Sequence, residues 1–166
     1  MSTQQGTFKL MTHVRRYAWS LLFFQLFGVV SPVFGKDLSV LIRVLHGAFI
    51  AENGYAMCMV PSITLSESDR AVFINARNYA QWMKQRVSAG LTDDEVQFVL
   101  KSAADQARAE MLEVVRILKS NPPDKEYSEL FRWCTTNMKP IADRLVHTYV
   151  SDPNAYNKLI EDAKHD

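Results

Sequence analysis

The segment of residues 53–62, NGYAMCMVPS, places a cysteine, Cys58, between two methionines. Thiolate and thioether sulfur are the ligands that Cu(I) prefers, so the segment could contribute to a copper site. His46, His147 and Met138 are candidates to complete it. The chain has no methionine-rich repeat, however, and methionine is commonly a filler of helical cores. We therefore predict no metal site and keep copper as an alternative.

A disulfide is the second chemistry open to this segment. Cys58 and Cys134 are the only two cysteines of the chain. An even pair in one exported domain most simply forms a disulfide. The bridge would close a loop of about 77 residues, for which the chain-entropy relation gives roughly 4–5 kcal/mol of stabilisation. We predict that Cys58 and Cys134 are joined.

The N-terminus indicates the compartment. Arg15 and Arg16 precede an apolar run at residues 17–30, and Pro32 and Gly35 follow it. This succession of charged, apolar and small residues is typical of a secretory signal peptide. The run is shorter than the roughly 20 apolar residues that a membrane-spanning helix needs. The sequence therefore predicts export to a periplasm, with cleavage after Gly35.

This interpretation divides the chain into a signal peptide, residues 1–35, and one domain, residues 36–166. Met11 is a possible true start, and a signal segment retained as an anchor is the alternative. Cleavage would leave 131 of the 166 residues, with 16 basic against 18 acidic side chains and a net charge near −2. Nucleic-acid binding needs a clustered basic face, so this class of function is disfavoured.

The periodicity of the apolar residues predicts an all-α domain. Spacings of three and four mark one face of a helix, and they recur over residues 38–54, 67–90, 92–121, 124–149 and 153–164. We expect a single helical bundle of four main helices plus a short C-terminal helix, stapled by one disulfide.

Polar side chains mark several of the helix starts. Ser66 and Thr92 occupy N-cap positions, and Thr92 with Glu95 forms a capping-box pattern. Asp152 followed by Pro153 is typical of an N-cap and a first helical position. We therefore expect helices to begin directly after residues 66, 92 and 152.

The fourth helix carries a predicted inward stripe of seven residues: Tyr127, Phe131, Cys134, Met138, Ile141, Leu145 and Tyr149. Pro140 lies within this helix and lacks a backbone N–H. We expect it to kink the helix, because one intrahelical hydrogen bond is lost there.

Short catalytic and cofactor motifs are missing from the sequence. The chain has no Cys-x-x-Cys-His, no Glu-x-x-His, no His-Glu-x-x-His and no Gly-x-Ser-x-Gly. The acids Glu52, Glu67, Glu110 and Glu113 have no motif around them. We predict no catalytic residue, no cofactor and no enzyme. A bundle that holds haem, copper or another small ligand, and an enzyme with an unrecognised site, remain alternatives.

These exclusions favour a protein that acts by binding another protein. The expected partner is a secreted cell-wall hydrolase or another toxin, for an inhibitor or immunity protein, or a client of an adaptor. The apolar segment 55–65, expected to be a loop held by Cys58, is the first candidate surface. Six residues are predicted to contact the partner: Tyr55, Met57, Met59, Ile63, Trp82 and Trp133. Alternatively, these side chains fill the flanks of the bundle.

Overall fold

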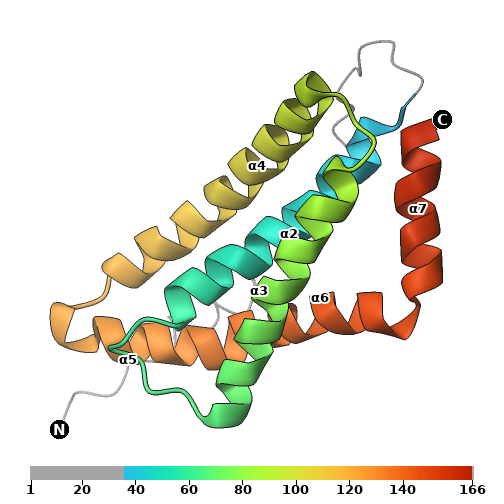
Figure 1. The fold of residues 1–166 in the computed structure, drawn as a ribbon. Coiled ribbons are helices and arrows are strands. Elements are labelled where there is room, and N and C mark those ends of the chain that lie inside the picture. Colours follow the sequence, from blue (N-terminus) through green and yellow to red (C-terminus); the bar gives the residue numbers. More distant parts are fainter. Residues whose placement is uncertain (1–35, 166) are drawn as a thin grey trace, which may run out of the picture. The chain divides into compact units, whose positions relative to one another are not determined.

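The computed structural model describes residues 36–165, and the regular elements of this part are all helices (Figure 1). The predicted signal peptide, with Met11, lies outside the described residues. The elements are α2 (Leu38–Cys58), α3 (Glu67–Ser88), α4 (Asp93–Lys119), α5 (Pro123–Trp133), the π-helical turn η1 (Cys134–Met138), α6 (Lys139–Ser151) and α7 (Pro153–His165). Four main helices, the fourth formed by α5, η1 and α6, plus a C-terminal helix confirm the predicted fold class. Within residues 36–165, no helix has the length and apolar character needed to cross a membrane.

Helix α2 is the centre of the domain, because it packs against α3, α4, α6 and α7. Figure 1 shows α2, α3 and α4 side by side with alternating directions, and α6 crosses α3, against which it packs. Helix α7 returns toward the start of α2, where the Asp37 N–H donates to the Ala163 carbonyl at 2.9 Å. The largest fully buried side chains come from four of these elements, α2, α3, η1 and α7: Leu41, Leu45, Phe73, Met83, Met138 and Ile160.

The predicted helix starts are confirmed. Ser66 Oγ accepts the N–H of Asp69 at 3.1 Å in the first turn of α3. Thr92 and Glu95 form the complete capping box at the start of α4, and Asp152 accepts the Ala155 N–H at 2.9 Å in α7. Each cap satisfies a backbone donor that the helix itself leaves without a partner.

The predicted end of the first helix at Gly54 is wrong, because α2 continues to Cys58. A Cβ atom at position 54 would lie 2.8 Å from Met138 Cγ and Sδ. Glycine therefore serves the close approach of α2 and η1 rather than a helix end. The connection to α3 is consequently residues 59–66, called here the 59–66 loop, and not the predicted segment 55–65.

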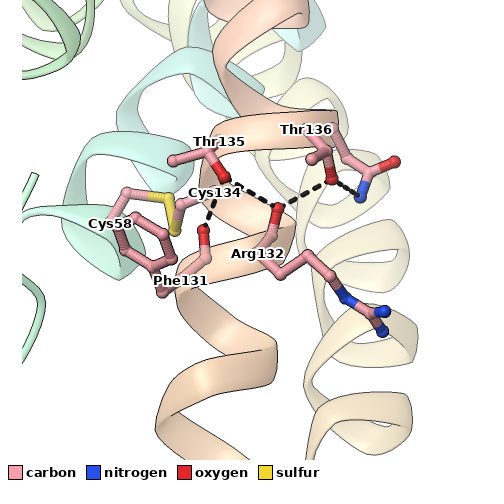
Figure 2. The surroundings of a disulfide bond; sticks show 7 residues. Cys58, Phe131, Arg132, Cys134, Thr135 and Thr136 are labelled. Carbon is pink, nitrogen blue, oxygen red and sulfur yellow. Dashed lines mark hydrogen bonds between the residues drawn. A yellow bond between two sulfur atoms is a disulfide. The ribbon is translucent and has the colours of Figure 1, made fainter.

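The irregularity predicted at Pro140 is the π-helical turn η1. It ends at Met138, two residues before Pro140, which is the second residue of α6. The Lys139 N–H donates to the carbonyl of Cys134, five residues earlier. Two hydroxyls satisfy carbonyls upstream: Thr135 Oγ1 donates to Phe131 at 3.0 Å, and Thr136 Oγ1 donates to Arg132 at 2.7 Å (Figure 2). A π-helical turn of this kind accommodates one more residue than an α-helical turn.

The extra residue shifts the buried face of α5, so the predicted inward stripe is wrong at its start. Tyr127 and Phe131 are 61% and 42% exposed. Leu130 and Trp133 pack against the core instead. From η1 onward the stripe is confirmed, since Cys134 is buried and the following members of the stripe lie in or against the core.

Candidate partner-binding site at the 59–66 loop

The disulfide predicted between Cys58 and Cys134 is present, with a sulfur–sulfur distance of 2.05 Å. It joins the last residue of α2 to the first residue of η1 (Figure 2). Both cysteines are fully buried, so solvent does not reach the bridge in the folded domain. The bridge therefore fixes the origin of the 59–66 loop to the fourth helix.

The disulfide removes the thiolate on which the copper alternative depends. The other candidate ligands are engaged elsewhere: Met138 packs against Gly54, His46 Nε2 lies 3.0 Å from Glu110 Oε1, and His147 Nδ1 lies 3.0 Å from Ser151 Oγ. Among residues 36–165, no group of three or more His, Cys, Asp or Glu side chains is placed to hold a metal ion.

The acids considered for catalysis lie on the surfaces of helices. Glu52 pairs with Lys84 at 2.8 Å across α2 and α3. Glu113 pairs with Arg116 at 2.7 Å along α4, and this hydrogen bond lowers the pKa of the Glu113 carboxyl. Glu67 is exposed at the start of α3. These three carboxylates lie on the surfaces of different helices, and they do not form a paired acid and base.

Ile63, Trp82 and Trp133 are three of the six predicted partner-binding residues, and of these only Ile63 is buried. Ile63 is only 6% exposed, so the expectation of an exposed Ile63 is wrong. The 59–66 loop folds back and places Ile63 in the core. Trp82 is half-buried, with its ring centroid 4.5 Å from that of Tyr149, and Trp133 is half-buried against the core.

The other three predicted residues lie at the junction of α2 and the 59–66 loop. Tyr55 and Met57 are helical rather than in a loop, since α2 includes both, and Met59 is the first residue after α2. All three are half-buried against the core. Each of the three therefore keeps part of its side chain exposed.

A pocket of about 310 Å³ opens between the end of α2, the 59–66 loop and the first turn of α3. Six apolar residues line it: Cys58, Met59, Val60, Pro61, Ile63 and Leu65. Thr64 and Arg70 are its polar lining residues. Its volume lies near the lower end of the range of roughly 300–1,000 Å³ typical of ligand pockets.

The salt bridge between Asp69 and Lys139 lies next to this pocket, because Asp69 directly precedes the lining residue Arg70. It ties the first turn of α3, which includes Arg70, to the start of α6. The hydrogen bond from Lys139 lowers the pKa of the Asp69 carboxyl, with a further contribution from Ser66. Asp69 is thus engaged within the domain and leaves the neighbouring Arg70 available.

The structure brings Met59 and Ile63 to the pocket. Other residues that line the pocket were not predicted from the sequence. Val60, Pro61 and Arg70 are the main additions. Nothing in the sequence marked Pro61 as a pocket residue except the apolar character of its segment. Arg70 did have one, because cationic residues recur every seven positions along α3.

No protein-family description, curated protein or solved structure matches this chain.

Proposed function

We propose that residues 36–166 act as a non-enzymatic domain that binds another protein, as an inhibitor or immunity protein or as an adaptor. The pocket at the 59–66 loop carries this proposal, because a disulfide at its base anchors a surface recess in which six of the eight lining residues are apolar. A preorganised site loses little conformational entropy on binding, which favours affinity. Met59 lines the pocket, and Tyr55 and Met57 are half-buried in the last turn of α2.

The proposal includes export through a signal peptide that is cleaved after Gly35. The buried disulfide supports it, because such bonds persist in oxidising compartments such as a periplasm. N-terminal sequencing of the protein recovered from the cell envelope should give Lys36 as the first residue. A chain that retains residues 17–35 in the membrane fraction would contradict the cleavage.

The binding function is tested by capture from periplasmic extract, and against the product of a neighbouring gene for a cell-wall hydrolase. The wild-type protein should retain one partner stoichiometrically. Val60→Glu should weaken this capture by tenfold or more, because it places a charge in the apolar recess. Val60 is half-buried and packs against the core, so capture is compared at a temperature at which circular dichroism shows the variant to be folded.

Val150→Glu is the matched control, because Val150 is 62% exposed on α6, which contributes no lining residue to the pocket. It should capture the partner as the wild-type protein does. Equal capture by both variants would remove the 59–66 loop from the contact. Turnover of a cell-wall or peptide substrate by the purified protein alone would contradict the binding function.

A further inference from the structure

Three cationic side chains recur every seven residues along α3: Arg70, Arg77 and Lys84. The second and third have partners on α2. The Arg77 guanidinium lies 4.8 Å from the centroid of the Tyr55 ring and donates to the Tyr55 hydroxyl at 3.3 Å. Lys84 Nζ lies 5.1 Å from the centroid of the Phe49 ring and 2.8 Å from both carboxylate oxygens of Glu52. Each of the two cations thus meets an aromatic face and an oxygen from α2.

Arg70 occupies the corresponding position two turns earlier, where α2 has already ended. Its side chain is exposed and lines the pocket. Among residues 36–165, no side chain forms an ion pair, hydrogen bond or cation–π contact with its guanidinium. Asp69 is engaged by Lys139, and Glu67 is exposed without contacting Arg70. Helix α2 therefore supplies an aromatic ring and an oxygen to Arg77 and to Lys84, and it supplies neither to Arg70.

The pocket and Arg70 together define the chemistry of a ligand. The apolar lining favours an apolar side chain, since burial removes its surface from water. A guanidinium binds a carboxylate through two parallel hydrogen bonds, which neither a neutral amide nor a hydroxyl reproduces. Arginine is also enriched among the residues that dominate protein interfaces. The chain after the predicted cleavage carries a net charge near −2. Attraction of an acidic group therefore comes from Arg70 and not from the net charge of the domain.

We propose that the pocket at the 59–66 loop binds a segment of the partner protein in which an apolar side chain lies within two residues of Asp or Glu. The apolar side chain enters the recess, and the carboxylate pairs with Arg70. A peptide segment supplies both groups from one chain, an apolar side chain for the recess and a carboxylate for Arg70. This inference rests on the proposed protein-binding function and names the chemistry of its partner.

The test uses a displayed library of random 12-residue segments, selected on the immobilised, oxidised protein recovered from the cell envelope. Segments that pair an apolar residue with a nearby acid should be enriched. Individual enriched segments should bind Arg70→Gln at least tenfold more weakly than wild type. Replacing their acid by the corresponding amide should weaken binding to wild type equally, and should have no further effect on Arg70→Gln.

Arg108→Gln is the matched control, because Arg108 is exposed on α4, which contributes no lining residue to the pocket. It should bind the segments within twofold of wild type. Enriched segments without the acid, equal binding by Arg70→Gln, or no enrichment at all would overturn the inference. Capture of a periplasmic partner equally by wild type and Arg70→Gln would overturn it while leaving the protein-binding function intact. Failure of both the selection and the capture would count against both proposals.

Discussion

Removal of the Cys58–Cys134 disulfide is expected to lower the free energy of unfolding by about 4–5 kcal/mol. The bridge spans 76 positions of sequence, and a long closed loop restricts the unfolded chain strongly. A domain of this size is commonly stable by only about 5–15 kcal/mol, so the loss is a large fraction of the total. Urea unfolding followed by circular dichroism, with and without reductant, measures the difference.

The double variant Cys58→Ala/Cys134→Ala is the control for this measurement, because reductant has no disulfide to act on there. Its unfolding midpoint should be low and unaffected by reductant. In the wild-type protein, both cysteines are fully buried, so alkylation of native protein should label neither of them. Two thiols that react in freshly isolated native protein, or an unchanged midpoint after reduction, would contradict the role assigned to the bridge.

Trp133→Ala is expected to lower the free energy of unfolding by about 2–3 kcal/mol, below the range for a fully buried tryptophan. The expectation follows from the shifted face of α5, which packs Trp133 against the core. Phe131→Ala should cost less than about 1 kcal/mol, because the Phe131 side chain is 42% exposed. Chemical unfolding of the two variants under identical conditions gives the comparison.

The two substitutions distinguish a π-helical turn from a continuous α-helix. An uninterrupted α-helix would place Phe131 on the buried stripe, and the order of the two losses would be reversed. The pair also separates the structural role of Trp133 from a contact role. Weakened capture of the partner by Trp133→Ala with unchanged stability would place this side chain in the interface instead of the core.

The sequence by itself determined the features that depend on neighbouring residues. The helix starts after Ser66, Thr92 and Asp152 were predictable, because each cap is made by a side chain to a backbone group within three residues. The all-α class followed from apolar periodicity. The disulfide was predictable because the chain offers one pairing of Cys58 with Cys134.

Features that depend on distant packing were decided by the tertiary structure. Gly54 lies inside a helix rather than after one because Met138, from another element, packs directly against it. Ile63 is buried because the 59–66 loop folds onto the core, and an apolar residue in a loop sequence fits either orientation.

The π-helical turn is another feature that the sequence did not determine, although it lies within one helix. Pro140 indicated an irregularity, but a proline can be accommodated by a kink, a break or an extra residue. The insertion of that residue exposes Phe131 and turns Trp133 inward.

The candidate site depends most on tertiary structure. The seven-residue spacing of Arg70, Arg77 and Lys84 is visible in the sequence, yet it does not tell which cation lacks a partner. That distinction arises because α2 ends at Cys58, so α2 supplies Tyr55 and Glu52 to the other two cations and nothing to Arg70. Local spacing sets which residues share a helix face, whereas contacts between helices decide which of those residues stays free to bind.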